Sequence, residues 1–217
     1  MAEPQFGPVA TRALFENDAV KVWEMDLKPG EICGTHRHTM DYVLYILEGG
    51  KLAVEGPGIK PFTFAAGTRS VYFVPPGAVE NARNIGRTGF HEALFELKRP
   101  PRAGTERPGF AMCEALVDQE PRFGVVSILE NDRVRIRETT LAPGQETGMS
   151  FNSRDAVVYV IEGGELRQVE RSTQDGPEQS VEAELGAGSV QWRPRGVYRN
   201  AINLGQARYR QVSVELK

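Results

Sequence analysis

The chain has 217 residues, a length that suits either one large domain or two small ones. Its 26 basic and 29 acidic residues give a formal net charge of -3, which argues against a nucleic-acid-binding or membrane-surface protein, because both need a basic face. With 40% hydrophobic and 25% charged residues, the composition is that of a globular protein and not of a disordered one.

The first residues, MAEPQFGPVATRALFEND, lack the basic start and the apolar run of a secretory signal. No stretch approaches the ~20 apolar residues that a membrane helix needs. Two cysteines, Cys33 and Cys113, do not make a disulfide framework. We therefore expect a reduced, cytoplasmic protein.

The chain contains an internal repeat. Up to residue 50 the repeated segments lie 114 residues apart, and beyond it they lie 119 apart. The extra residues fall in the polar loop 171–179, where an insertion costs little free energy. The matched segments are LFENDAVKV (14–22) with ILENDRVRI (128–136), LKPGEICG (27–34) with LAPGQETG (141–148), YILEGG (45–50) with YVIEGG (159–164), PPG (75–77) with PRG (194–196), and NARN (81–84) with NAIN (200–203).

Each copy of the repeat has the pattern of short β-strands. Segments such as 20–27, 41–49 and 70–75 are rich in β-branched and aromatic residues and are separated by glycine and proline. Many short strands at regular spacing predict sandwiches or closed barrels, an all-β fold. We predict one domain at 1–98, a Pro- and charge-rich linker at 99–123, in which 111–119 has a short helical pattern, and a second domain at 124–217.

All three histidines lie in the first copy, and two of them, His36 and His38, are separated by a single residue. Alternate side chains of an extended segment point to the same face, so both imidazoles can reach one cation while Arg37 points away. Gly30, six residues before His36, and the Glu-Gly-Gly turn at 48–50 make the pattern more specific than a lone His-x-His pair.

This pattern resembles the first motif of the cupin superfamily, and the segment from Gly67 through 75–77 to Asn84 resembles the second. The resemblance covers both copies, so the chain is similar to a bicupin. It implies two tandem cupin jelly-roll β-barrels. In active members each barrel has a pocket that holds a divalent metal through two histidines, a glutamate and a third histidine.

The sequence departs from the cupin ligand pattern at two positions. Tyr42 stands where the family has its glutamate, and Glu80 stands where it has its third histidine. The resemblance then leaves His36, His38 and Glu80 as ligands for one divalent transition metal, which is Fe(II), Mn, Ni or Zn. Tyr42 and Glu80 are the candidate proton-transferring residues. The alternatives are a metal-free polar pocket, a packing role for Tyr42 and a surface position for Glu80.

Three further residues in the first copy have plainer interpretations. Asp41 is retained as Asp155 in the second copy, which lacks the histidines, so we expect a structural role such as a turn or a pairing with arginine. Strand alternation places His91 on a mostly apolar face, where a hydrogen-bonded structural histidine is expected and a metal ligand is not. We expect Cys33 to be a small buried residue and not a nucleophile.

The second copy lacks the candidate ligands. Ser150, Asn152 and Arg199 stand at the positions of His36, His38 and Glu80, so we expect a catalytically silent domain with a structural role. An alternative role for the pocket of the second copy is to bind an anion, because Arg199, Arg195 and Arg210 fall at or near pocket positions. Solvated arginines are the other interpretation.

Two classes of function fit these motifs. The first is a metal-dependent enzyme acting on a small organic acid, diketone or aromatic compound by dioxygenase, decarboxylase, isomerase or lyase chemistry. The second is a non-catalytic sensor or storage-like protein that binds a small molecule. The expected partner is a small-molecule substrate, without nucleic acid or membrane. The sequence leaves open whether two chains pair as a homodimer.

Overall fold

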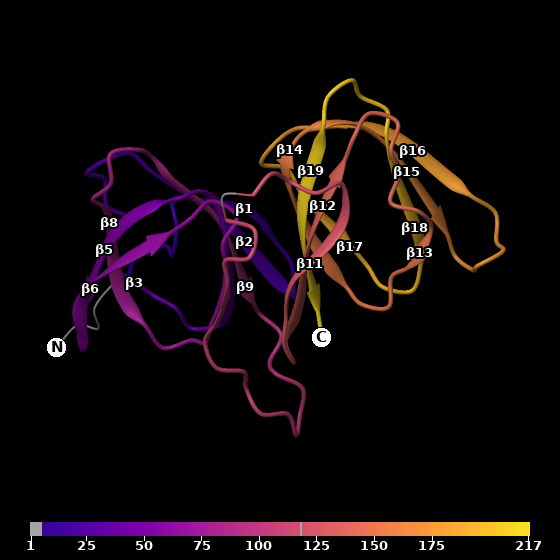
Figure 1. Ribbon diagram of the computed structural model, residues 1–217. Helices are drawn as coiled ribbons and strands as arrows, with labels where there is room; N and C mark the ends of the chain where they lie inside the picture. Colours follow the sequence, from indigo (N-terminus) through magenta and orange to yellow (C-terminus); the bar gives the residue numbers. More distant parts are fainter. Residues whose placement is uncertain (1–5, 118) are drawn as a thin grey trace. The chain divides into compact units, whose positions relative to one another are not determined.

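The computed structural model describes residues 6–117 and 119–217, and it divides into two compact units, Met1–Gln119 and Glu120–Lys217 (Figure 1). All the regular secondary structure in the described residues is β-strand. No helix in this part of the chain is long and apolar enough to cross a membrane. The all-β prediction is confirmed.

The short helix expected at 111–119 is wrong for the described residues. Ala111–Cys113 forms strand β10, which pairs with β7 (Val71–Val74) in the first unit, and turns follow it. The backbone hydrogen bonds of Ala111–Cys113 are therefore made to a neighbouring strand and not within a helix. Part of the segment predicted as a linker is thus paired into a sheet.

The first unit consists of two antiparallel sheets, drawn in indigo to magenta in Figure 1. The larger sheet has the order β1-β2-β9-β4-β7-β10, and the smaller has the order β3-β8-β5-β6. The remaining strands of this unit are β1 (Arg12–Glu16), β2 (Val20–Leu27), β3 (His36–Arg37), β4 (Asp41–Glu48), β5 (Gly50–Gly56), β6 (Ile59–Ala66), β8 (Val79–Asn84) and β9 (Phe90–Leu97).

The second unit repeats this plan with the sheet orders β11-β12-β19-β14-β17 and β13-β18-β15-β16. No sheet in the described residues closes on itself, so each unit is a pair of open sheets where closed barrels were expected. The strands of the second unit are β11 (Gly124–Glu130), β12 (Val134–Leu141), β13 (Ser150–Phe151), β14 (Ala156–Glu162), β15 (Gly164–Arg171), β16 (Gln179–Leu185), β17 (Val190–Arg193), β18 (Tyr198–Asn203) and β19 (Tyr209–Leu216).

The repeat in the sequence is also a repeat in the backbone. The bulge between Ile46 and Glu48 in β4 recurs between Val160 and Glu162 in β14. The irregularity in β1 likewise recurs in β11. Bulges are specific local features, so their recurrence at equivalent positions shows that equivalent residues of the two units can be compared directly.

The apolar core of each unit lies between its two sheets. Strand alternation directs one face of every strand inward, and the buried clusters therefore draw on both sheets. In the first unit the cluster contains Met25, Leu27, Ile46, Tyr72 and Phe90 from the larger sheet and Leu52, Val54, Ala66 and Ala82 from the smaller. In the second it contains Leu141, Val160 and Tyr209 with Leu166, Leu185 and Ala201.

A buried asparagine joins the end of the smaller sheet to a neighbouring turn in the first unit. The Asn84 amide donates to the carbonyls of Leu27 at 2.8 Å and Thr88 at 2.9 Å, and its oxygen accepts the Gly86 N–H at 2.8 Å. Asn203 makes the equivalent three hydrogen bonds in the second unit. The side chain thus satisfies backbone groups that no strand pairing reaches.

We expect Asn84→Ala to destabilise the first unit by about 2 kcal/mol, because it removes three hydrogen bonds and leaves buried backbone groups unpaired. Thermal unfolding followed by circular dichroism should show a midpoint several degrees lower than in the wild type. Gln174→Ala, which truncates an exposed amide in a loop, is the control and should leave the midpoint unchanged. Equal midpoints for Asn84→Ala and the wild type would contradict this role.

Candidate metal centre

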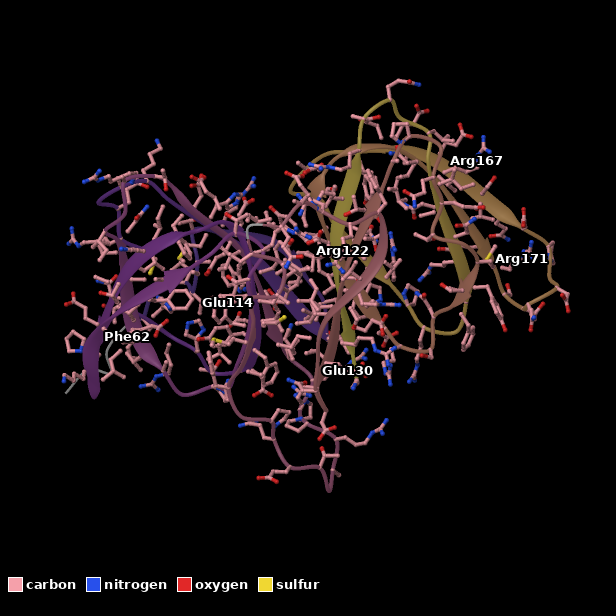
Figure 2. All side chains as sticks on the ribbon, viewed as in Figure 1. Phe62, Glu114, Arg122, Glu130, Arg167 and Arg171 are labelled. Atoms are coloured by element: carbon pink, nitrogen blue, oxygen red, sulfur yellow. The ribbon has the colours of Figure 1, made fainter. Side chains whose placement is uncertain are left out.

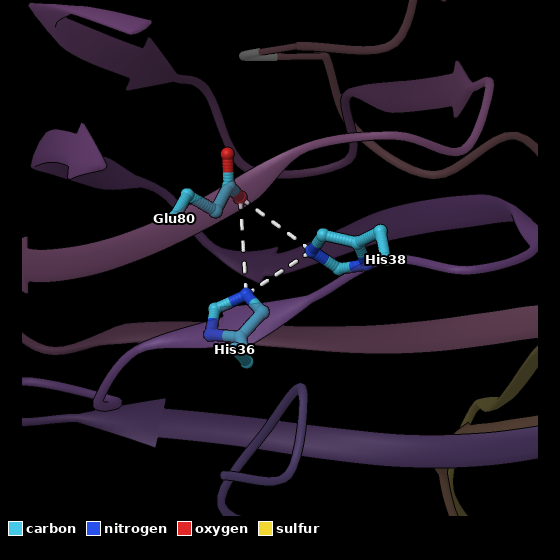
Figure 3. Close-up of side chains that lie close together, drawn as sticks. All are labelled: His36, His38 and Glu80. Atoms are coloured by element: carbon cyan, nitrogen blue, oxygen red, sulfur yellow. Dashed lines mark hydrogen bonds and ion pairs between the residues drawn. The ribbon is translucent and has the colours of Figure 1, made fainter. Parts of the chain in front are cut away.

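The three predicted ligands come together at one end of the smaller sheet in the first unit (Figure 3). His36 in β3 is the cross-strand partner of Glu80 in β8, and His38 follows two residues later on the same face. The Nε2 atoms of His36 and His38 lie 3.1 Å apart, and they lie 3.9 Å and 3.5 Å from Oε1 of Glu80. Both histidines are buried, and Glu80 is partly exposed.

A backbone contact orients the ring of His36. Its Nδ1 lies 2.9 Å from the carbonyl oxygen of Gly34, which can only accept, so this nitrogen carries the proton. Burial is the largest effect on this ring and lowers the pKa of His36, which favours the neutral imidazole. The Nε2 lone pair of His36 therefore points toward His38 and Glu80.

The donor set fits a divalent transition metal. Two imidazole nitrogens and one carboxylate oxygen lie within 4.8 Å of one another, the ligand types of a two-histidine, one-carboxylate site. With the His36 proton on Nδ1, the 3.1 Å contact between the two Nε2 atoms is a hydrogen bond donated by His38, and a cation bound there would take the place of its proton. The other nitrogen of His38, its buried Nδ1, has no hydrogen-bond partner in the described residues.

Tyr42 lies directly against the candidate centre. Its ring stacks on the ring of His38 with the centroids 4.0 Å apart and an interplanar angle of 15°. Burial, followed by the neighbouring carboxylates of Glu80, Glu92 and Glu96, raises the pKa of Tyr42 well above its ordinary value of 10. The hydroxyl therefore stays protonated and can serve as a hydrogen-bond donor, while the ring restrains His38.

The ligands form part of the wall of a cavity of about 370 Å³ inside the first unit. Apolar side chains make up most of this wall, and its phenylalanine and tyrosine members are Tyr42, Phe62, Phe64, Tyr72 and Phe110. Phe62 lies at the outer edge of the unit in Figure 2 and is 51% exposed. None of the described lining residues is a lysine or an arginine. The cavity thus combines a small polar site with a mostly apolar wall that carries no basic side chain.

Glu92 is a cavity residue that the sequence reasoning missed. It lies in β9, is buried, and lines the cavity together with Glu80. Burial first, and then the charge of Glu80, raises the pKa of Glu92 to about 8, so this carboxyl binds a proton near neutral pH. Strand alternation could have indicated this position, because neighbouring side chains of a strand point to opposite faces and Glu92 therefore lies on the face of β9 opposite to that of His91.

The plainer interpretations of His91 and Asp41 agree with the structure, and Cys33, expected to be buried, is partly buried. His91 contacts Glu24 at 2.9 Å on the outer face of β9 and does not line the cavity. Asp41 is buried and lies 3.3 Å from Arg107. Burial raises the pKa of the Cys33 thiol, whose sulfur accepts the backbone N–H of Ala82 at 3.4 Å. None of these three side chains is aimed at the space between the ligands.

In the second unit the positions of the ligands are occupied by other side chains in the same backbone frame. Ser150 pairs with Arg199 across β13 and β18, as His36 pairs with Glu80. Asn152 stands at the position of His38. Among the described residues, His36, His38 and Glu80 are the one group of three close metal-ligating side chains.

Comparison with solved structures assigns the fold. A tryptophan-to-tyrosine variant of oxalate decarboxylase from Bacillus subtilis superposes with a TM-score of 0.69 at 13% identity, covering 97% of this chain and 78% of that one. A structure concerned with the Mn(II) centres of the same enzyme superposes with a TM-score of 0.68 at 12% identity over the same shares. The chain has a cupin fold.

These structural likenesses show the fold alone. A serine-to-alanine variant of the same Bacillus subtilis enzyme gives a TM-score of 0.68 at 13% identity, covering 92% of this chain and 69% of that one. The sequence matches no protein-family model and no curated protein sequence. At such low identity, the chemistry of the neighbours does not carry over to this chain, because one fold hosts many functions.

Protein purified without chelators should carry close to one transition-metal ion per chain, measured by elemental analysis. His36→Ala with His38→Ala should remove that ion, because one carboxylate alone is a weak site. Ser150→Ala with Asn152→Ala changes the equivalent positions of the second unit and is the matched control, which should keep the ion. Equal metal content in all three proteins would place the metal elsewhere.

Glu92 should make the stability of the metal-stripped protein depend on pH. A carboxyl whose pKa rises from 4.5 to about 8 on folding holds its proton more tightly in the folded state. Its stabilising contribution is therefore complete below pH ~4.5 and is lost as the pH rises through about 8. Glu92→Gln should match the wild type near pH 5 and exceed it by up to a few kcal/mol above pH 8 in urea unfolding. Parallel curves would show that Glu92 ionises freely.

Proposed function

We propose that this chain is a metal-dependent cupin enzyme built from two tandem cupin modules, with its metal centre in the first module and none in the second. The observation that carries the proposal is the meeting of two imidazoles and one carboxylate at the wall of an apolar cavity. A purely structural module gains little from two buried histidines beside a carboxylate, because burying polar groups is destabilising and the Nδ1 of His38 has no partner in the described residues.

His36, His38 and Glu80 would hold the metal, and the Gly34 carbonyl would keep the His36 ring in the tautomer that presents Nε2. The donor set accepts Fe(II), Mn, Ni or Zn, and the fold neighbours include an enzyme with Mn(II) centres. When bound, such an ion supplies Lewis-acid polarisation of substrate oxygens. Every other contribution comes from the side chains around the cavity.

Two groups of the cavity wall can hold or move protons. Glu92, with a pKa of about 8, exists in both protonation states near neutral pH and is suited to general acid–base transfer. The Tyr42 hydroxyl, whose pKa is raised, donates a hydrogen bond to a developing negative charge on the substrate. The sequence suggested Glu80 both as a metal ligand and as a proton-transferring residue, and in this proposal it acts as a ligand.

The cavity wall selects among the substrate classes that the sequence left open. The structural neighbours are named for oxalate, which is a dianion. In this chain a dianion would enter a cavity that is lined by the carboxylates of Glu80 and Glu92 and by no lysine or arginine among the described residues. Aromatic and aliphatic side chains instead suit an uncharged carbon skeleton. We therefore propose a small diketone or an aromatic compound with adjacent oxygens, and not a small dicarboxylic acid.

The test is turnover by the metal-loaded protein with pentane-2,4-dione, catechol and oxalate, followed by oxygen consumption and product chromatography. We expect conversion of one of the first two and none of oxalate. Glu80→Gln should lower kcat/KM more than about 100-fold, because even residues that only support a metal ligand contribute 10- to 100-fold. Glu55→Gln, which changes an exposed glutamate in β5, is the control and should retain full activity.

The outcomes separate the competing functions. Conversion of oxalate alone would contradict the proposed substrate class while leaving the metalloenzyme. Saturable binding of catechol without turnover, with metal present, would favour a non-catalytic small-molecule-binding protein. Absence of metal in the wild type would overturn the proposal as a whole.

A further inference from the structure

The interior of the second unit contains a polar cavity lined by arginines. It consists of two lobes of about 80 Å³ and 120 Å³, which have Arg137, Arg193, Ser150, Asn152 and Ser213 in common. Three of these side chains come from the larger sheet and two from β13 and the residue after it. The space therefore lies between the two sheets, as the apolar cavity does in the first unit.

The repeat shows how this cavity differs from its counterpart. Arg193 pairs with Ala156 in the register in which Val74 pairs with Tyr42. In the same way Ser213 replaces Leu94, Thr139 replaces Met25 and Gln211 replaces Glu92. The backbone frame is retained, while apolar lining residues become donors of hydrogen bonds and the buried acid becomes an amide.

Arg193 forms no ion pair with a carboxylate in the described residues, and the charge of Glu170, which is bound to Arg199, reaches it only at longer range. The Arg193 guanidinium donates to the amide oxygens of Gln211 at 3.2 Å and Gln191 at 3.4 Å, which are weak, neutral contacts. Burial, with help from Arg199 and Arg137, lowers the pKa of Arg193. A guanidinium nonetheless stays protonated in proteins, so this partly buried charge favours the arrival of an anion.

The surrounding side chains add to this positive charge. The lining of the two lobes contains the arginines 135, 137, 154, 193 and 199 and the glutamates 170 and 215. Arg199 is bound to Glu170 at 2.6 Å and Arg137 to Glu215, while Glu130 binds Arg135 from outside the cavity. The buried Nε of Arg137 has no hydrogen-bond partner. Donors and positive charge are thus in excess.

The arginines expected at this pocket from the sequence are only partly the right ones. Arg199 lines it, but Arg195 is exposed and contributes its backbone N–H to Asp155, at 2.9 Å. Arg210 is held by Glu162 at 2.8 Å and by Glu138 at 3.4 Å, away from the cavity. Arg137 and Arg193 carry the site in their place.

We propose that the second unit binds a small carboxylate anion between Arg193 and Arg137. The planar guanidinium fork matches the two oxygens of a carboxylate, and such charge-assisted hydrogen bonds are about twice as strong as neutral ones. Ser150, Asn152 and Ser213 supply hydroxyl and amide groups for a second polar end. The size of the lobes limits the anion to a few carbon atoms. The site does not depend on a metal in the first unit.

The test is isothermal titration calorimetry of the full chain with malonate at constant ionic strength. We expect saturable binding of the wild type and a loss of at least about tenfold in affinity in Arg193→Gln, which keeps hydrogen-bonding groups but removes the charge. Arg167→Gln is the matched control, because Arg167 is a half-exposed arginine in β15 bound to Glu182 outside the cavity (Figure 2), and it should bind like the wild type.

A second variant covers the case in which Arg193→Gln does not fold. Ser213→Leu restores the side chain that the first unit has at this position, fills the cavity and leaves every arginine in place. Ser213→Leu should abolish the binding of malonate. Malonate should raise the thermal unfolding midpoint of the wild type, because a bound ligand stabilises the folded state, and should leave the midpoint of the variant unchanged. Equal affinities in wild type and both variants, equally tight binding of inorganic phosphate, or no saturation by malonate would each overturn the proposal.

Discussion

The site depends on the pairing of β3 with β8. This register places Glu80 directly opposite His36, and a shift by one residue would turn every side chain of β3 to the other face. Because His38 follows His36 by two residues, the same register that brings Glu80 to one imidazole brings it to both. Backbone hydrogen bonds made before any ligand binds therefore determine the geometry of the ligand atoms.

The two units use one backbone plan for two kinds of interior. The inward faces of equivalent strands carry Val74, Leu94 and Met25 in the first unit and Arg193, Ser213 and Thr139 in the second. Strand pairing hardly depends on these side chains, since main-chain groups form the ladders. The lining of the cavity can therefore change from apolar to polar while the bulges are retained and the sheet orders differ only by the additional β10 of the first unit.

The sequence predicted the strands, the repeat and the closeness of His36 and His38, because period-two alternation and the spacing of the two histidines are local signals. Glu80 joined them only through the resemblance to the second cupin motif. It did not predict Glu92 as a cavity residue or β10, because both depend on which strands become neighbours. Arg137 and Arg193 were missed for the same reason. Their strands β12 and β17 are separated by β19 and β14 in the sheet, so their common cavity is a property of the curved pair of sheets.

Each interior retains an ionisable group that its own packing does not neutralise. In the first unit Glu80 and Glu92 share an apolar cavity, so one carboxyl holds a proton, and a cation at the histidines would lower the free energy of the remaining negative charge. In the second unit Arg193 is positively charged, and a bound anion would lower the free energy of that charge in the same way. Buried groups of this kind lower the stability of the protein alone, and a bound ligand of opposite charge would restore part of it. The sign of the unpaired charge therefore indicates the ligand that each interior accepts.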